Sequence, residues 1–418
     1  MTAKLTPDQV QIVRSTVPIL KEHGNAITLN FYDTMIKDVP ELNNIFNRAS
    51  QANGHQAGAL AGALYAYASH IDDLGALSPT VEKICQKHAS LYIQPEHYKV
   101  VGEYLLQAMG TVLGAALTPE ILEAWGAAYW QLANIMINRE AQLSDTAPNW
   151  TNWRDFQITN KFKESDEITS FYLQPLDNKP LPTFLPGQYT SIQTDVPSLN
   201  YLQCRHYSLS DAPNPSYYRI SVKREAGVDP TNPDHVKHPG YVSNILHDAK
   251  NPGDVIKVSH PRGEFFYSPS GAADHPIVLL SAGIGITPML SILNTHNASG
   301  SKQPVSFIHG ARTTASRAFH RHAQYLADRH EHVKYTAFIK SPDTEKDVEG
   351  EHYHHRGRLS LGKLDREKEL FVSDDSTQYF VCGPETFMTE VEKGLMEMGV
   401  EQSRIHMEMF GSGVMARS

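Results

Sequence analysis

The chain has 418 residues, which predicts two to three domains, and its 40% hydrophobic and 20% charged residues are typical of a soluble globular protein. A formal net charge of −9, without any dense run of Lys or Arg, excludes the basic footprint of a nucleic-acid binder. Three scattered cysteines, Cys85, Cys204 and Cys382, exclude a disulfide framework and a structural zinc site. The N-terminus shows no secretory signal, so we expect a cytoplasmic protein, and nothing demands more than a monomer.

Residues 1–147 form the first predicted domain, and their patterns are helical. Thr6 begins one helix-capping signature and Thr118 begins another, each followed by a proline. No part of this region alternates as a strand would, so we expect an all-α domain. A polar, proline-containing break at 144–149 ends it.

The second predicted domain, residues 151–266, changes to short runs of alternating polarity. Such runs lie at 189–192, 218–223 and 254–258, separated by clusters of Pro, Gly and Asn. This pattern predicts an antiparallel β-barrel. The stretch 226–240, with its prolines and histidines, is expected to be a long surface loop.

The third predicted domain, residues 272–418, alternates buried-type strands at 277–280, 305–308 and 379–381 with helical patterns. This alternation is typical of an α/β domain with a parallel sheet. The uncharged stretch 276–293 is long enough to raise the question of a membrane span, but its glycines and proline favour a strand, a tight turn and a helix. We therefore expect no stable membrane insertion.

His88 lies on a predicted helix, on the same face as Val81, Ile84 and Cys85, so its imidazole should point inward. A buried neutral imidazole can donate a lone pair to haem iron. The alternative is a core histidine bonded to a backbone carbonyl. Taken alone, the helix favours that alternative.

Four upstream residues change the balance: Tyr32, Phe46, Gln56 and Leu60. Gln56 and Leu60 are four apart and share a helix face. Singly, each has an ordinary explanation as a core or solvated side chain. In this order and spacing, and with His88, they make the region resemble a globin, and specifically the globin part of flavohaemoglobins.

The resemblance implies a role for each. Phe46 would wedge the haem, and His88 would be the proximal iron ligand. Gln56 would be the distal polar residue, and Leu60 would restrict the pocket to small gases. Tyr32 would face the dioxygen substrate, because a phenol donor in a dry pocket stabilises negative charge developing on oxygen.

Tyr98 and Glu140 resemble the flavohaemoglobin pair that hydrogen-bonds near the proximal imidazole. A carboxylate behind a ligating histidine raises the basicity of that histidine and favours electron push toward oxygen. The alternative for Glu140 is a surface position near a helix C-terminus, where the helix dipole makes a carboxylate slightly unfavourable.

The tetrapeptide 205–208 matches the RxYS flavin motif of the ferredoxin-reductase family. The Arg would supply a fixed cation for the FAD pyrophosphate, the Tyr would pack on the isoalloxazine, and the Ser would reach flavin N5. Segments 186–189 and 240–244 flank it as in that family, although alone they also read as a loop turn and a helix cap. The expected FAD contacts are Gln188, Tyr189, Arg205, His206, Tyr207, Ser208, Gly240, Val242, Ser243 and Asn244.

The segment 283–288 has the form G-x-G-x-T-P, which is the nucleotide turn of the same reductase family and not a GxGxxG. Alone it would also suit an ordinary strand–helix turn. The family places 382–384 beside the nicotinamide, although a buried core thiol is the commoner fate of a cysteine. The expected NAD(P)H contacts are Gly283, Gly285, Thr287, Pro288, Cys382, Gly383 and Pro384.

Near the end of the chain, Glu408 resembles the residue that approaches flavin and haem, and Phe410 resembles the one that shields the flavin face. One departure from the family is the expanded stretch 226–239, which resembles fungal members more closely.

The resemblance covers essentially the whole chain and implies the order all-α globin, antiparallel β-barrel FAD domain, α/β NAD domain. It implies a nitric oxide dioxygenase with haem b, FAD and NAD(P)H, acting on dioxygen and nitric oxide. Two other functions stay open: a haem-linked NAD(P)H diaphorase or peroxide reductase, and a haem-based oxygen or redox sensor. The sequence does not distinguish NADH from NADPH.

Overall fold

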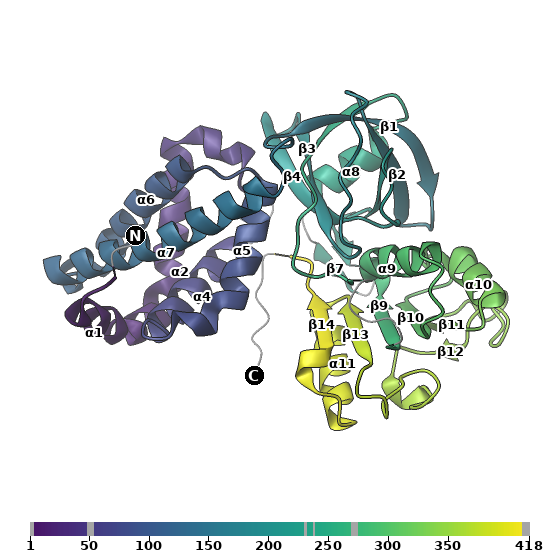
Figure 1. Ribbon diagram of the computed structural model, residues 1–418. Coiled ribbons are helices and arrows are strands. Elements are labelled where there is room, and N and C mark those ends of the chain that lie inside the picture. The colour runs from purple at the N-terminus through teal and green to yellow at the C-terminus, as the bar shows by residue number, and fades with distance from the viewer. Residues whose placement is uncertain (1–3, 48–53, 230–231, 237–238, 269–274, 412–418) are drawn as a thin grey trace.

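Three units follow one another along the chain, with a helical unit on one side and two sheet-containing units stacked on the other (Figure 1). The computed structural model describes residues 4–47, 54–229, 232–236, 239–268 and 275–411. This arrangement confirms the predicted fold class, an all-α unit followed by an antiparallel β unit and a parallel α/β unit.

The helical unit packs its α-helices around one core and joins them through short 3-10 turns. Its elements are α1 (Pro7–Ser15), α2 (Val17–Asp38), η1 (Pro40–Asn44), α4 (His55–Ser69), η2 (Leu74–Leu77), α5 (Ser78–Ser90), α6 (Pro95–Leu113), η3 (Gly114–Ala116) and α7 (Pro119–Asp145). The capping signature at Thr6 is confirmed, because its hydroxyl accepts from the Gln9 N–H at 3.2 Å and the Gln9 side chain accepts from the Thr6 N–H at 3.0 Å.

The core of this unit holds one face of α2. Ile27, Phe31 and Met35 recur at helical spacing, are almost fully buried, and belong to one hydrophobic cluster with Trp125 of α7. Burying each such side chain stabilises the fold by about 2 kcal/mol. Tyr32 follows Phe31 by one position, about 100° around the helix; it packs against this core while partly buried, and both rings line a cavity.

The second unit is a six-stranded antiparallel sheet in the order β4-β3-β8-β1-β2-β5, with a bridge between Leu209 and Ile220 linking its two edges. Edge-to-edge closure of this kind leaves fewer strand edges exposed. Its elements are β1 (Arg154–Lys163), β2 (Ile168–Pro175), β3 (Tyr189–Val196), β4 (Tyr201–Ser208), β5 (Tyr218–Lys223), α8 (Tyr241–Asp248) and β8 (Val255–Val258).

The expected surface loop at 226–240 contains structure. β6 (Val228–Asp229) and β7 (Asn232–Val236) pair as an antiparallel hairpin with an irregular register. An extended segment satisfies its backbone N–H and C=O groups by pairing with itself. The prolines in the segment hide this from a period-two reading, because proline is depleted in strands.

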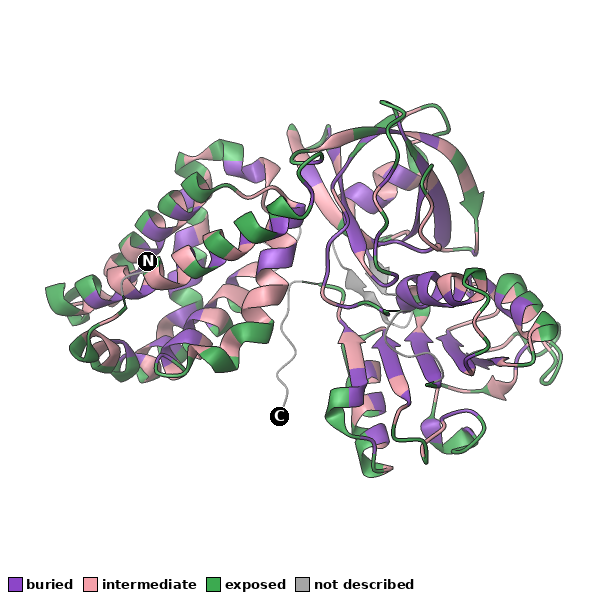
Figure 2. Ribbon diagram, in the orientation of Figure 1, coloured by how far each residue is buried: buried purple, intermediate pink, exposed green. Residues whose placement is uncertain are grey.

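The third unit is a parallel sheet in the order β12-β11-β10-β9-β13-β14, covered by α9 and α10 on one face and α11 on the other. Figure 2 shows the strands buried and the outer helix faces exposed. Its elements are β9 (Ile277–Ala282), η4 (Gly283–Gly285), α9 (Ile286–Ala298), β10 (Val305–Ala311), α10 (His320–Arg329), β11 (Val333–Ile339), β12 (His355–Arg356), β13 (Gln378–Cys382), α11 (Glu385–Glu397) and β14 (Ile405–Glu408).

The strand order of this sheet fixes where a ligand can bind. The chain runs outward from β9 through β10 and β11 to β12, then restarts at β13 on the other side of β9. Ligands of open parallel sheets bind outside the carboxyl ends of the strands at such a reversal. Here that crevice lies between the turn after β9 and the loop after β13.

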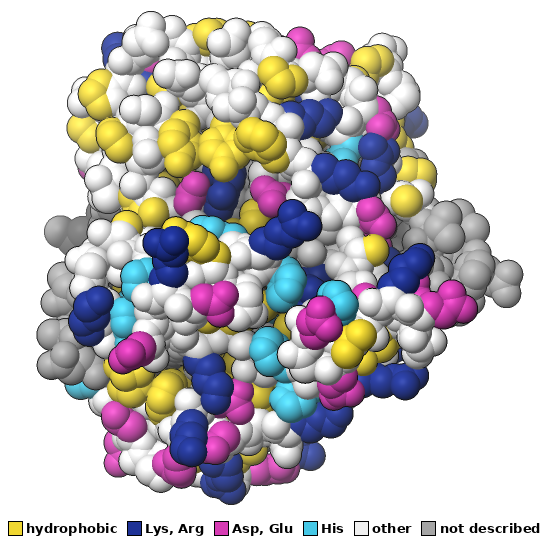
Figure 3. All heavy atoms as spheres, turned by 90° about the vertical axis from the view of Figure 1, so that its right-hand side faces the viewer, with side chains coloured by type: hydrophobic (Ala, Val, Ile, Leu, Met, Phe, Trp, Pro, Cys, Tyr) yellow, Lys and Arg dark blue, Asp and Glu magenta, His cyan; other side chains and the backbone are white. Residues whose placement is uncertain are grey.

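The uncharged stretch 276–293 folds as β9, the turn η4 and the start of α9, as the sequence indicates. Within the described ranges, no helix has the length and apolar character needed to cross a bilayer. On the face of the two sheet units that Figure 3 presents, acidic and basic side chains are interspersed, as on an ordinary solvated surface.

Candidate functional site

The proximal histidine is held by a carboxylate and a phenol from two other helices. His88 Nδ1 lies 2.9 Å from Glu140 Oε1 and 2.9 Å from the Tyr98 hydroxyl oxygen, and the Tyr98 hydroxyl donates to the same Glu140 oxygen at 2.5 Å. A carboxylate only accepts, so the imidazole proton sits on Nδ1. Nε2 therefore carries the lone pair, which is the state that ligates iron.

The partners of His88 are buried. Glu140 is 7% exposed, which removes the alternative of a surface glutamate, and α7 continues five residues beyond it to Asp145. Burial and the Glu140 charge raise the pKa of Tyr98 far above its usual value, so Tyr98 stays a donor. The Tyr129 hydroxyl donates to the Tyr98 carbonyl at 2.5 Å and fixes α6 against α7.

The His88 ring opens into a cavity with an almost wholly apolar lining. The lining side chains come from α2, η1, α4, α5, α6 and α7, so all parts of the helical unit contribute. They are Phe31, Tyr32, Leu42, Ile45, Phe46, Leu60, Ala63, Leu64, Tyr67, Ile84, His88, Ile93, His97, Tyr98, Val101, Leu105, Tyr129, Leu132, Ala133 and Met136.

The structure brings Tyr32, Phe46 and Leu60 to the lining of this cavity, and Gln56 lies outside the lining, against Tyr32. The Tyr32 and Phe46 rings meet edge to face with centroids 5.5 Å apart, and Leu60 lines the same wall. The Gln56 side chain hydrogen-bonds to the Tyr32 hydroxyl, and burial raises the pKa of Tyr32 well above its usual value. Gln56 Oε1 is buried without a protein partner. An apolar slot with one lone-pair nitrogen and one phenol donor fits a haem.

The predicted flavin motif lies on β4 opposite β3, and strand alternation divides its residues. Ser191 pairs with His206 and Ile192 with Arg205, so His206 faces one side of the sheet while Arg205 faces the other. The Arg205 guanidinium is largely enclosed, donates to the Cys204 carbonyl at 2.7 Å, and has its pKa lowered by burial. Enclosed guanidinium N–H groups fit a phosphate anion.

The segments 186–189 and 240–244, which flank the flavin motif, offer a ligand mostly backbone groups. The Gln188 side chain closes its own turn by accepting from the Leu185 N–H at 2.9 Å and donating to the Gly263 carbonyl at 3.2 Å. The Tyr189 hydroxyl, in contrast, is buried without a protein partner.

At the start of α8, Val242 is fully buried in the core, and both Ser243 and Asn244 bond to the backbone of Glu225. Gly240 is the N-cap, where a Cβ would lie 2.5 Å from Ser243 Oγ. What this segment can offer a phosphate is therefore the N–H groups of the helix start.

The nucleotide turn after β9 is shaped by two glycines. Gly283 has φ +56° and open space where a Cβ would be, so its backbone can approach a ligand. Gly285 packs directly on the backbone of residues 382–383. The Thr287 hydroxyl donates to the Ile284 carbonyl at 3.0 Å, and Pro288 is buried inside the first turn of α9.

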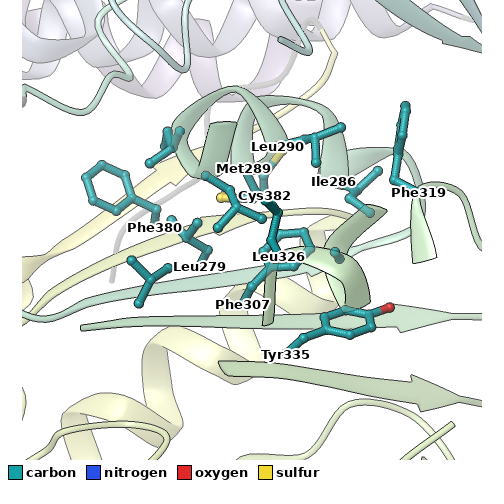
Figure 4. Packing of buried hydrophobic residues seen from close by; sticks show 14 of the residues in the cluster. Leu279, Ile286, Met289, Leu290, Phe307, Phe319, Leu326, Tyr335, Phe380 and Cys382 are labelled. Atoms are coloured by element: carbon teal, nitrogen blue, oxygen red, sulfur yellow. The ribbon is translucent and has the colours of Figure 1, made fainter. Parts of the chain in front are cut away.

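The loop after β13 meets this turn through its backbone. The Cys382 side chain is 0% exposed and lies among Leu279, Met289 and Phe380 under α9 (Figure 4). Its thiol is thus a core group, and burial raises its pKa well above the usual value. A groove beside this loop runs from Gly283 to Pro384, and its walls include cations that sequence reasoning missed: Arg312, Lys340 and Arg358.

Glu408 lies where the three units meet. It is the last residue of β14, pairs with Cys382, and is 7% exposed. Burial raises the pKa of Glu408 to about 7, against the opposing charges of Lys83 and Lys87 on α5. Lys87 Nζ donates to the Gly411 carbonyl at 2.9 Å, so Gly411, the last described residue, lies at α5, and Phe410 beside it is 42% exposed.

Arg205 should be essential for flavin and not for haem. Arg205→Ala is expected to weaken FAD binding by about 10- to 100-fold, the effect of losing charge-assisted bonds worth about 1.5–3 kcal/mol. The measurement is a fluorescence titration of the deflavinated protein with FAD, together with the Soret absorbance, which should not change. The matched control is Arg224→Ala, which removes a more exposed ion pair to Asp248 in the same unit. Equal FAD affinity in both variants would contradict the assignment.

The fold and site define a class of protein: a globin joined to a flavin- and nicotinamide-type oxidoreductase. Residues 29–136 match the globin family model, and residues 279–393 match that of the oxidoreductase NAD-binding domain. The chain is 42% identical over 417 residues to the flavohemoprotein of Bordetella parapertussis, covering 99% of this chain and 100% of the relative. It is 43% identical over 406 residues to that of Bacillus subtilis, covering 96% of each. The chain belongs to the flavohaemoglobin (flavohemoprotein) family.

Solved structures agree with this. A flavohemoglobin from Malassezia yamatoensis with bound FAD and heme superposes with a TM-score of 0.84 at 28% identity, covering 98% of this chain and 100% of that one. The FAD/NAD-binding domain of a nitric oxide dioxygenase from Vibrio cholerae superposes with a TM-score of 0.53 at 33% identity, covering 62% of this chain and 98% of that one. The predicted recognition is thus confirmed, and the fungal character of 226–239 stays a prediction.

Proposed function

We propose that this chain is a nitric oxide dioxygenase that binds haem b, FAD and NAD(P)H. The observation that carries the proposal is the geometry at His88: Nδ1 lies 2.9 Å from Glu140 Oε1, which assigns the proton to Nδ1, and the ring lines an apolar cavity together with Tyr32. Bound together, the three groups supply hydride transfer from the nicotinamide to FAD, single-electron transfer to the haem iron, and an iron centre at which nitric oxide and dioxygen form nitrate. Two nitric oxide and two dioxygen molecules would consume one NAD(P)H, yielding two nitrates, NAD(P)⁺ and a proton.

In the helical unit, the residues of the chain would hold the haem and polarise the dioxygen bound to it. Glu140 and Tyr98 orient the His88 ring and make it more basic, which would favour electron release from the ring to a bound iron. Tyr32, kept protonated by burial and steadied by Gln56, donates a hydrogen bond where negative charge develops on oxygen. Phe46 and Leu60 exclude water and limit the cavity to small gases.

In the sheet units, the residues would bind and orient FAD and the nicotinamide nucleotide. Arg205 and the N–H groups from Gly240 onward would hold the FAD phosphates, and Tyr207 and Ser208 would hold the flavin ring. The turn 283–288 and the loop 382–384 bracket the nicotinamide nucleotide at the topological reversal. Glu408, with its pKa near 7, lies close to this meeting point and can hold a proton there at neutral pH.

The domain bounds, the localisation and the oligomeric state in this proposal are those expected from the sequence. We place the three domains at 1–147, 151–266 and 272–418. We propose a cytoplasmic monomer that acts on nitric oxide as well as dioxygen and binds no nucleic acid.

The decisive experiment measures NADH and NADPH oxidation under air, with and without nitric oxide, together with nitrate. A dioxygenase should show oxidation that nitric oxide stimulates, with two nitrates formed per NAD(P)H. Turnover that nitric oxide does not stimulate would indicate a diaphorase or peroxide reductase. Negligible turnover in both conditions would indicate a sensor.

Tyr32 should control how long dioxygen stays bound. Tyr32→Phe is expected to speed dioxygen dissociation about 10- to 100-fold, because a hydrogen bond to a charged acceptor worth about 1.5–3 kcal/mol is lost. Laser photolysis or stopped-flow mixing of the ferrous protein measures this rate. The control is Tyr65→Phe, an exposed tyrosine on α4. Dissociation as slow as in the control would remove the distal role.

A further inference from the structure

A row of hydrogen bonds crosses the boundary between the helical unit and the barrel. The Ser90 hydroxyl donates to the Lys87 carbonyl at 2.7 Å, the Ser191 hydroxyl donates to Ser90 Oγ at 3.0 Å, and His206 Nδ1 lies 2.8 Å from Ser191 Oγ. Ser90 is 1% exposed and Ser191 is 0% exposed, so the two hydroxyls are in the interior, whereas the His206 side chain at the end of the row is exposed. It joins α5 to β3 and β4, and Ser90 and Ser191 are 101 positions apart along the chain.

All hydrogen bonds of the row donate in the same direction, from His206 toward Lys87. A carbonyl only accepts, so the Ser90 proton points at Lys87, and the Ser191 proton is used on Ser90. The remaining proton, between His206 and Ser191, must then sit on His206 Nδ1. The surrounding protein, followed by the charges of Lys87 and Arg205, lowers the pKa of His206, so the ring is neutral at neutral pH. Nδ1–H donates and Nε2 carries the lone pair.

Each end of the row lies next in sequence to a residue of one of the two proposed redox sites. One end is the carbonyl of Lys87, the residue directly before His88 on the proximal helix. The other end is His206, which sits between Arg205 and Tyr207 on the flavin-binding strand and points to the opposite face of the sheet. Both hydroxyls of the row are buried at the boundary, where an unmade hydrogen bond costs about 1–3 kcal/mol. A shift of one unit against the other would break the row.

We propose that His206, Ser191 and Ser90 form a latch that sets the position of the proximal helix on the flavin-binding strands. His206 is then a positioning residue for electron transfer from FAD to haem. This inference rests on the proposed function only in requiring that both groups bind and that electrons pass between them. Electron transfer falls steeply with separation, and a displacement of about 1 Å in a reacting pair can cost a factor of about 100. The latch acts on this single step and leaves hydride transfer from NAD(P)H to FAD unchanged.

Stopped-flow mixing of the holoenzyme with NADH, without oxygen and under carbon monoxide, tests the latch. Flavin reduction and the Soret band of the carbon monoxide-trapped ferrous haem are followed separately. We expect Ser191→Ala and Ser90→Ala each to slow haem reduction about tenfold, within the range that small displacements produce, while flavin reduction is unchanged. The double variant should be no slower than the slower single variant, because both break the same row.

The matched control is Ser170→Ala. Ser170 is also in the barrel, is 0% exposed, and shares a hydrogen bond of 2.8 Å with Ser221, but this pair lies on β2 and β5 away from the boundary. Its loss should leave both reduction rates within about twofold, since barrel stability alone is affected. Comparable slowing in the control would show that the effect comes from barrel stability and would overturn the latch.

Substitutions of His206 give a second, independent measurement. The amide of Asn can place its NH₂ where Nδ1–H lies, so His206→Asn should retain haem reduction within about twofold of the unaltered protein, whereas His206→Leu should lose about tenfold. Equal rates in Asn and Leu variants would overturn the latch, as would loss of FAD from Ser90→Ala. An enzyme that produces no nitrate, yet shows slow haem reduction in the row variants, would contradict the proposed function and leave the latch standing.

Discussion

His88→Ala is expected to produce a protein that is yellow and not red. The substitution removes an imidazole that lines the apolar cavity and has a carboxylate 2.9 Å from its Nδ1. Haem content, measured by Soret absorbance and pyridine haemochrome after reconstitution with haemin, should fall to about a tenth or less, because axial ligation is the principal polar bond to the group. FAD content should be unchanged, since the flavin contacts lie on other elements.

The His88 experiment has a control on the same unit. His70→Ala removes an exposed imidazole whose Nδ1 lies 2.9 Å from the Ala66 carbonyl oxygen, and it should retain haem. Normal haem content with an unchanged Soret maximum in His88→Ala would show that another residue ligates the iron. Loss of both haem and FAD would indicate misfolding, which far-ultraviolet circular dichroism of the variant and of His70→Ala would reveal.

Gly285→Ala is expected to disable the nicotinamide site without a change of charge. A Cβ on Gly285 would lie 2.2 Å from the Cys382 carbonyl oxygen and 2.8 Å from the Gly383 nitrogen, which are backbone atoms that cannot rotate away. The turn after β9 and the loop after β13 must then separate. We expect destabilisation of the α/β unit by about 3 kcal/mol or more and a fall of about 100-fold in the rate of flavin reduction by NADH.

Stopped-flow flavin reduction and urea unfolding measure the two effects in Gly285→Ala. The control in the same unit is Gly362→Ala, where the nearest atom to the new Cβ is Ser360 Oγ at 3.8 Å. Haem and FAD content should be retained in both variants. Flavin reduction in Gly285→Ala at the rate of the control would mean that the turn tolerates a side chain and that the close approach does not shape the site.

Much of the secondary structure could be predicted from local residue patterns. Capping at Thr6 and the strands near 189, 218, 277 and 305 follow from residue spacing of about 3.6 or 2, which a chain displays without any tertiary contact. The inward orientation of His88 follows from the same helical periodicity. The order of the motifs indicated candidate cofactor sites, because each motif depends on backbone geometry within a few residues.

The side-chain environment of several predicted residues could not be read in this way. Gln188 closes its own turn, Val242 and Cys382 are core side chains, and Ser243 bonds to Glu225. A motif gives the path of the backbone, but which face a side chain presents depends on the elements packed against it. The hairpin at 228–236 was missed for a related reason, since pairing of a proline-containing segment with itself leaves no clear alternation.

By itself, the sequence determined three domains, their fold classes and the inward-facing histidine, because these depend on short-range periodicity and backbone geometry. Only the tertiary structure decided that Glu140 lies behind His88, that Lys87 bonds to Gly411, and that Ser90 bonds to Ser191. These contacts join residues up to more than three hundred positions apart, and they exist only where the packed units exclude water. Hydrogen bonds and charges gain direction and strength in such an interior, and a linear order of residues does not specify it.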